Sequence, residues 1–149
     1  MIFPAPSCIT PPIMAGYCMD EVTSEVVQQW FRKAEHDLQN IRNNLASETI
    51  PTDTVCFHAQ QAIEKMLKGV LVANSRNISK THDLVKLLTD VADIFPELLP
   101  YEEQLEDISE YGVGLRYPDD FFEPTLDEGR HAYEVALEIE TIILNKIRF

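Results

Sequence analysis

The chain has 149 residues, which is enough for one domain with a single hydrophobic core. Apolar residues make up 45% and charged residues 25%, as in globular proteins, and this composition excludes a fibrous or disordered chain. No apolar run approaches the ~20 residues of a membrane helix, so none is predicted. The formal charge of −13 repels phosphate polyanions and argues against nonspecific nucleic-acid binding, although specific RNA contact through a local basic pocket stays open.

Residues 1–22 are predicted to form a flexible or extended N-terminal tail. Residues 1–18 contain several prolines and neither Lys nor Arg, so they lack the basic region and unbroken apolar stretch of a secretory signal. Translation starting at Met14 or Met19 is an alternative. The three cysteines are an odd number without C-x-x-C spacing, which predicts free thiols in a reducing cytoplasm.

From residue 24 onward, apolar residues recur at steps of three or four, which predicts helices throughout. The expected helices cover residues 24–46, 52–74, 81–94, 101–111 and 125–147. The second helix has Thr52 or Asp53 as its expected N-terminal cap, and the third has Thr81. Thr125 with Glu128 fits a capping box at the start of the last helix.

The helical segments predict an all-α fold, because no strand-like alternation of apolar and polar residues occurs. Short connections favour antiparallel neighbours, so residues 23–149 are expected to form an up-and-down four-helix bundle with a short additional helix. Two glycines, Gly112 and Gly114, predict a bend after the fourth helix. The apolar faces of the second and last helices are wider than one small bundle must cover, which predicts a homodimer.

Several common functional motifs are missing from the sequence. No G-x-x-x-x-G-K or G-x-G-x-x-G loop is present to cradle phosphates. The four histidines and three cysteines form neither H-E-x-x-H nor paired cysteines, so no metal site is expected. Cys56 lies in an apolar helical stretch and is predicted to be a small core residue rather than a nucleophile. No cofactor is therefore expected.

The densest polar cluster lies in the apolar second helix, over residues 60–68. One interpretation is a solvated face on which Glu64 with Lys68, and Gln61 with Lys65, form side-chain pairs at (i, i+4). The other is an interhelical groove that binds a ligand, in which buried charges must be paired. The residues predicted to form that groove are Asp37, Gln60, Gln61, Glu64, Lys65, Arg116 and Tyr117.

Four stretches together resemble the successive signatures of the HEPN family. They are Trp30 with Ala34, Asp37 and Leu38; Gln60-Gln61-Ala62-x-Glu64-Lys65-x-Leu67-Lys68; Thr81-His82-Asp83-Leu84; and Arg116-Tyr117-Pro118. The match is in order and covers residues 25–147. The resemblance implies an all-α bundle, usually a homodimer, found in prokaryotes and often encoded beside a minimal nucleotidyltransferase. The expected partners are therefore a second copy, a nucleotidyltransferase and a nucleotide, while the short apolar runs argue against a membrane.

Some members of the family are metal-independent toxin ribonucleases. In them an Arg and a His, four to six residues apart, meet in a cleft formed by both protomers of the dimer. In some toxin–antitoxin pairs the nucleotidyltransferase adenylylates a Tyr that lies two residues after this His. Here Arg116 occupies the arginine position, but the nearest following histidine, His131, lies after fourteen intervening residues, with Tyr133 as the modification candidate. Arg76 and His82 also have the Arg-to-His spacing of these ribonucleases, but they follow the second helix, whereas the family's motif lies just before the last helix.

Two functional hypotheses follow. The first is a dimeric, noncatalytic binding module that acts with a nucleotidyltransferase in a toxin–antitoxin-like pair and receives a nucleotide in the groove. The alternative is an endoribonuclease toxin whose composite cleft uses Arg116 and His131. The first is favoured because the compact Arg/His motif is missing.

Overall fold

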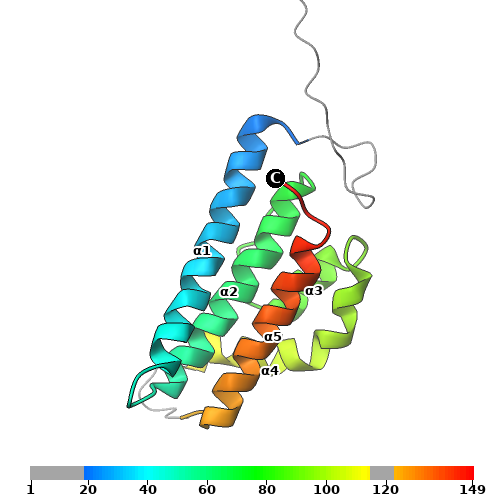
Figure 1. Ribbon diagram of the computed structural model, residues 1–149. Helices are drawn as coiled ribbons and strands as arrows, with labels where there is room; N and C mark the ends of the chain where they lie inside the picture. Colours follow the sequence, from blue (N-terminus) through cyan, green and yellow to red (C-terminus); the bar gives the residue numbers. More distant parts are fainter. Residues whose placement is uncertain (1–18, 115–122) are drawn as a thin grey trace, which may run out of the picture.

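The computed structural model describes residues 19–114 and 123–149, and these ranges contain helices and no strand. The all-α prediction is confirmed. This part of the chain forms five α-helices and one 3-10 helix, and Figure 1 shows how the α-helices are arranged. Their bounds are α1 (Glu21–Leu45), α2 (Thr52–Ala73), α3 (Leu84–Val91), η2 (Pro96–Tyr101), α4 (Glu102–Gly114) and α5 (Leu126–Leu144).

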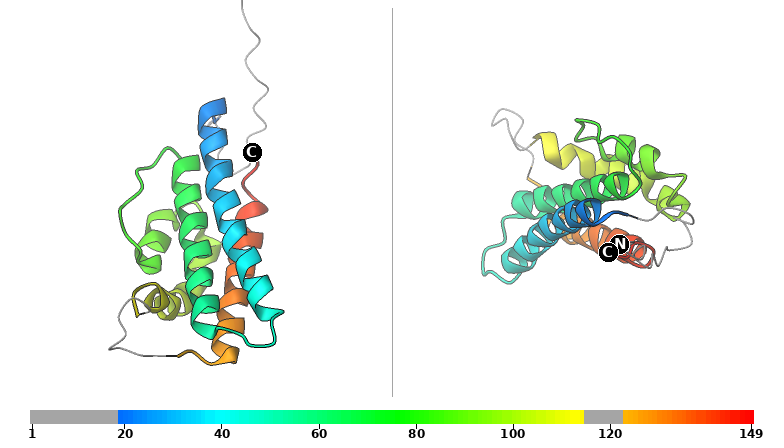
Figure 2. Two further views of the ribbon diagram at one scale, coloured as in Figure 1. Left: turned by 90° about the vertical axis from the view of Figure 1, so that its left-hand side faces the viewer. Right: turned by 90° about the horizontal axis from the view of Figure 1, so that it is seen from above.

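The helix α2 lies at the centre of the fold and contacts α1, α3, α4 and α5. In Figure 1, α1 runs antiparallel to α2, whereas α5 runs in the same direction as α2. The left view of Figure 2 shows α4 nearly end-on, so α4 crosses the three long helices. The predicted up-and-down arrangement of four main helices is therefore not confirmed.

The central position of α2 explains its wide apolar surface. Fourteen of its residues are buried, including Val55, Ile63, Leu67 and Leu71, and neighbouring helices cover them from several sides. On α2, the wide apolar face is therefore explained by packing against helices of the same chain. On this helix it is not evidence for the predicted dimer. Cys56 is free and buried in the same core, and burial raises the pKa of its thiol to about 12.

The structure refines two of the predicted helix caps. The N-cap position of α2 is Pro51, which makes no side-chain hydrogen bond, although the Asp53 Oδ1 accepts a hydrogen bond from the Thr54 amide of the first turn at 2.7 Å, as predicted. Asp83 caps α3, because its Oδ1 accepts hydrogen bonds from the amides of the next turn, whereas the Thr81 Oγ1 accepts one from the Asp83 amide.

The capping box at the start of α5 is confirmed. The Thr125 Oγ1 accepts a hydrogen bond from the Glu128 amide at 3.1 Å, and the Glu128 carboxylate accepts one from the Thr125 amide at 2.6 Å. At the other end of the fold, Ser75 follows the last turn of α2 with a φ of 54°. The amides of Ser75 and Arg76 donate to the Val72 and Leu71 carbonyls, which is the Schellman pattern of a helix end.

Gly112 permits a close approach of two helices rather than a bend. The prediction of a bend here was wrong, because α4 continues to Gly114. A Cβ atom on Gly112 would lie 2.8 Å from Cδ of Gln60 and 2.9 Å from its Oε1, which is closer than van der Waals contact allows. The missing side chain therefore lets α4 pack directly on a buried amide of α2.

No helix in residues 19–114 or 123–149 has both the length and the apolar character needed to cross a membrane.

Candidate functional site

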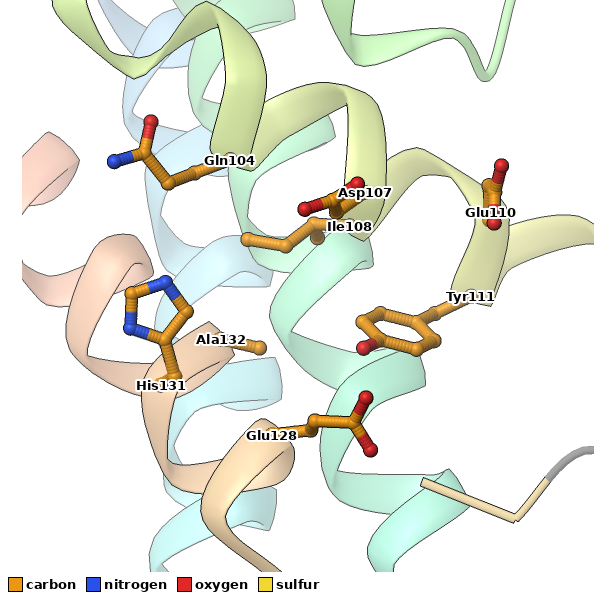
Figure 3. Close-up of a pocket in the computed structure, with 8 residues that line it drawn as sticks. All are labelled: Gln104, Asp107, Ile108, Glu110, Tyr111, Glu128, His131 and Ala132. Atoms are coloured by element: carbon orange, nitrogen blue, oxygen red, sulfur yellow. The ribbon is translucent and has the colours of Figure 1, made fainter. Parts of the chain in front are cut away.

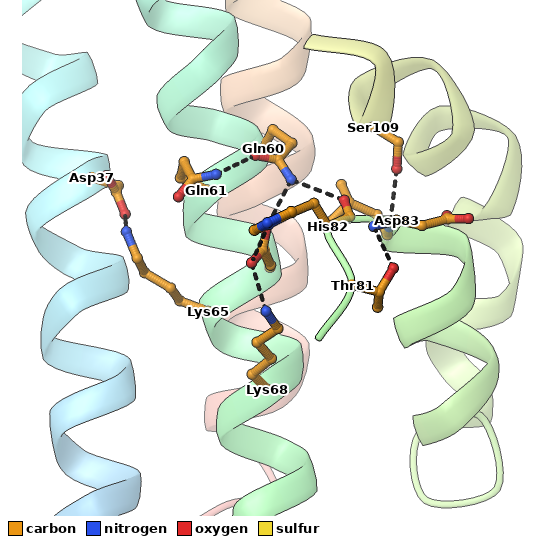
Figure 4. A network of polar contacts seen from close by, with 11 residues as sticks. Asp37, Gln60, Gln61, Lys65, Lys68, Thr81, His82, Asp83 and Ser109 are labelled. Carbon is orange, nitrogen blue, oxygen red and sulfur yellow. Dashed lines mark hydrogen bonds and ion pairs between the residues drawn. The ribbon is translucent and has the colours of Figure 1, made fainter. Parts of the chain in front are cut away.

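A cluster of polar side chains lies between α2 and the segment before α3, and it is buried except for His82, whose side chain is 59% exposed (Figure 4). We call Gln60, Glu64, Lys68 and His82 the Glu64 cluster. Gln60 is fully buried, and only 5% of Glu64 and 7% of Lys68 is exposed. The Lys68 Nζ donates to Glu64 Oε1 at 2.7 Å, and the Gln60 Nε2 donates to Glu64 Oε2 at 3.0 Å. The His82 Nδ1 lies 3.1 Å from both Glu64 oxygens.

These contacts leave Glu64 fully bonded. Burial raises the pKa of its carboxyl, but hydrogen bonds from Lys68, Gln60 and His82 outweigh burial and hold the pKa below the ordinary value of 4.5. The predicted solvated face is wrong for this pair, because both charges are buried. The prediction that buried charges would be paired is confirmed for Glu64 and Lys68.

The Glu64 cluster fixes the segment that leads into α3. The Gln60 Nε2 also donates to the His82 carbonyl at 3.2 Å, so one amide group holds both Glu64 and the backbone of that segment. The Leu84 amide, at the start of α3, donates to the Ser109 Oγ of α4 at 2.8 Å. Together these bonds join α2, α3 and α4.

A second polar cluster joins α1 to α2, and we call Asp37, His58 and Lys65 the Asp37 cluster. The His58 Nδ1 lies 2.8 Å from Asp37 Oδ1, and the Lys65 Nζ forms an ion pair with Asp37 Oδ2. The predicted contact between Lys65 and Asp37 is therefore observed. His58 was not predicted, although it lies seven residues before Lys65 and hence on the same face of the helix.

The predicted groove is divided into two parts by α2. Successive helical residues are separated by about 100°, so Gln60 and Gln61 lie on different faces. Gln60 and Glu64 face α3, whereas Lys65 faces α1. Between these two faces, the Gln61 Nε2 donates a hydrogen bond to the Gln60 Oε1 at 2.7 Å. Arg116 and Tyr117, the other two predicted groove residues, lie outside the described residues.

His131 lines a different cavity, of about 300 Å³, between α4 and α5 (Figure 3). Three carboxylates line the same cavity, from Asp107, Glu110 and Glu128. Tyr111 lies beside them, and burial followed by nearby negative charge raises the pKa of its hydroxyl to about 12. The surroundings of His131 are therefore strongly acidic.

The remaining predicted residues have structural partners. Tyr133 is half-buried on α5, and the Arg42 guanidinium of α1 bonds to Glu35 and to Tyr133, which raises the pKa of Arg42. Arg76 binds both carboxylate oxygens of Asp93, at 2.7 Å and 2.5 Å. Because His82 belongs to the Glu64 cluster, Arg76 and His82 bind different carboxylates.

Metal ligation is not indicated by the described geometry: within residues 19–114 and 123–149, no three His, Cys, Asp or Glu side chains gather in a metal-binding arrangement.

The fold and its polar contacts define an all-helical domain whose central helix carries two separate ionic clusters. A family model described as the HEPN domain matches residues 27–147, and the chain belongs to this family. The resemblance expected from the sequence motifs is confirmed. Among the curated proteins and the solved structures, none matches the chain.

Proposed function

We propose that this chain is a homodimeric HEPN binding module that acts with a minimal nucleotidyltransferase in a toxin–antitoxin-like pair. Membership of the HEPN family supports this proposal, because the resemblance implies such a partner. The proposal assigns the chain a role in binding rather than in RNA cleavage.

The observation that favours binding over cleavage is the charge around His131. A ribonuclease must hold a phosphate beside its histidine, and the carboxylates of Asp107, Glu110 and Glu128 repel a phosphate from this cavity. Stabilising charge on a scissile phosphate needs cations at the reacting atoms instead. We therefore rank a ribonuclease that uses a composite Arg116/His131 cleft as the second candidate function, after the binding module.

The surface of α5 supports the proposed homodimer. Leu137, Thr141 and Leu144 recur at steps of four and three along this helix, and 43% of Leu144 is exposed. A shallow cavity of about 320 Å³ lies on the same surface, lined by Tyr101, Leu137, Glu138, Thr141 and Ile142. A helix surface that combines the half-buried Leu137 and the exposed Leu144 is suited to pairing with its own copy across a twofold axis.

A nucleotide bound by Gln60 and Glu64 is not favoured, because their polar atoms already bond to protein groups. The part of the predicted groove that remains open to a nucleotide is the side of α2 that carries Gln61 and Lys65, whose side chains are partly exposed.

Co-expression with a nucleotidyltransferase encoded beside this chain tests the proposal. We expect the two proteins to co-elute in size-exclusion chromatography. Light scattering on the chain alone is expected to give twice its 17.0 kDa mass. Elution as separate proteins would contradict the pairing, and a mass of one chain would contradict the homodimer.

A growth assay separates binding from cleavage. We expect expression of the chain alone to have the same effect on growth with and without His131→Ala. Growth arrest that disappears in His131→Ala would instead support the ribonuclease alternative with Arg116 and His131.

A further inference from the structure

An open groove of about 620 Å³ follows the outer side of α1, away from the Glu64 cluster and bordered by Lys65 of the Asp37 cluster. It is lined by Val26, Gln29, Trp30, Arg32, Lys33 and His36 of α1, with Lys65 of α2 at its edge. Residues 26–36 span about 15 Å of helix axis, at about 1.5 Å per residue. The groove is therefore long enough for about three turns of a second helix.

The groove is locally positive although the chain has a formal charge of −13. No carboxylate lines it. In the described part of the chain, Arg32 and Lys33 form no ion pair, whereas Lys65 is bound to Asp37. Two exposed cations thus remain available for carboxylates that this part of the chain does not supply.

The groove also presents apolar surface. In its lining, Val26 is 38% exposed and the half-buried Trp30 lies one turn later; Val22, one turn before Val26 and outside the lining, is 71% exposed. Tryptophan and arginine are the residue types that contribute most often to binding energy at protein interfaces. An apolar stripe with cations beside it is complementary to an amphipathic helix with carboxylates along its edges.

We propose that this groove docks an acidic amphipathic helix of a partner protein. The inference rests on the proposed function, under which that protein is the nucleotidyltransferase. Apolar side chains of the partner helix cover Val26 and Trp30, and its carboxylates pair with Arg32 and Lys33. This contact neutralises charge on both sides without burying an unpaired cation.

A nucleic acid fits the groove less well than an acidic protein segment. Phosphate sites usually offer free backbone amides at a helix start or in a glycine-rich loop. The groove instead follows the middle of α1, where backbone amides are engaged in the helix. The net negative charge of the chain also opposes a polyanion, whose charge extends well beyond a groove of this length.

Trp30 offers a direct readout, because it is the single tryptophan of the chain. Incorporating 5-fluorotryptophan into this chain alone gives one fluorine signal, which reports on the groove even when the partner contains tryptophan. We expect this signal to shift when the purified nucleotidyltransferase is added. Single-stranded RNA and ATP are the competing probes, and neither is expected to shift it.

The decisive experiment compares two double variants with equal changes in charge. Arg32→Glu with Lys33→Glu reverses the charge of two cations that line the groove. Lys80→Glu with Arg130→Glu reverses the charge of two exposed cations outside its lining. Calorimetric titration with the nucleotidyltransferase is expected to show at least tenfold weaker binding for the groove variant and less than twofold for the control. Circular dichroism melts check that both variants fold.

Each contrary result has a distinct meaning. Equal binding by the groove variant and the wild type would overturn the docking site and leave the proposed pairing intact. Failure of the wild type to bind the nucleotidyltransferase would refute the pairing and, with it, this docking. A fluorine shift with RNA or ATP but not with the protein would assign the groove to a phosphate ligand instead.

Discussion

The Glu64 cluster and the α1 groove both place cations on a long helix, yet they differ in what surrounds those cations. Lys68 is buried, and its charge is matched by Glu64 within the same helix. Arg32 and Lys33 are exposed, and in the described ranges no carboxylate pairs with them. Removing one partner from the bonded, mostly buried cluster destabilises the fold, whereas exposed cations beside apolar surface are available to a partner protein.

Breaking the Glu64 cluster is expected to have the largest effect on stability. Glu64→Gln leaves the Lys68 ammonium buried without its counter-ion, and we expect a loss of about 3–5 kcal/mol in the free energy of unfolding. Urea denaturation measures this loss. The matched control is Asp90→Asn, which breaks the exposed (i, i+4) pair with Lys86 and is expected to cost less than about 0.5 kcal/mol. Equal losses would show that burial adds nothing to the Glu64 pair.

The same carboxylate predicts a dependence on pH. The pKa of Glu64 is lower in the folded chain than the ordinary 4.5, so the unfolded chain binds the proton more tightly. Its contribution to stability is present above pH 4.5 and is lost as the pH falls through the folded pKa. We expect the stability gap between the wild type and Glu64→Gln to narrow below pH 4.5 in urea titrations. A gap that stays constant down to pH 3 would contradict this assignment.

A smaller loss is expected from adding one methyl group beside the cluster. Gly112→Ala places a Cβ atom 2.8 Å from Cδ of the buried Gln60, and the resulting overpacking is expected to cost about 1–3 kcal/mol. Gly129→Ala is the control, because its Cβ atom would lie 3.3 Å from the nearest atom, Val55 Cγ1. Thermal unfolding is expected to show the larger decrease for Gly112→Ala, and the reverse order would argue against the close approach of α4.

The smallest effect on stability is expected in the α1 groove. Arg32→Glu and Lys33→Glu change exposed residues, and each is expected to alter the free energy of unfolding by less than about 0.5 kcal/mol. Urea denaturation of the single variants checks this. A loss above 1 kcal/mol would mean that these cations already stabilise the chain, and the contrast with the Glu64 cluster would then disappear.

The fold class could be predicted from the sequence because the apolar spacing is local information. The capping box of Thr125 and Glu128 was predicted for the same reason, since both partners lie within one turn. The cap of α3 could not be assigned in this way, because Thr81 and Asp83 are both able to cap and stand two residues apart. Tertiary packing against Ser109 of α4 fixes where that helix begins.

The predicted site was only partly recovered, for a geometrical reason. Asp37 and Lys65 do meet, but Gln60 and Glu64 belong to a different face of α2. The sequence alone does not show which neighbouring helix each face of α2 contacts, because this depends on tertiary packing. His58 could have been found from its spacing to Lys65, whereas the role of Gly112 depends on where α4 crosses α2.

The bonds around α3 also set where the chain tolerates insertions and deletions. Thr81, His82, Asp83 and Leu84 each bond a different group, so one added residue among them would shift every later bond out of register. Residues 77–80 lie between this run and Arg76, which is held by Asp93. Natural variation in length is therefore expected within 77–80, and constant length within 81–84, because lengthening a surface loop costs little conformational entropy.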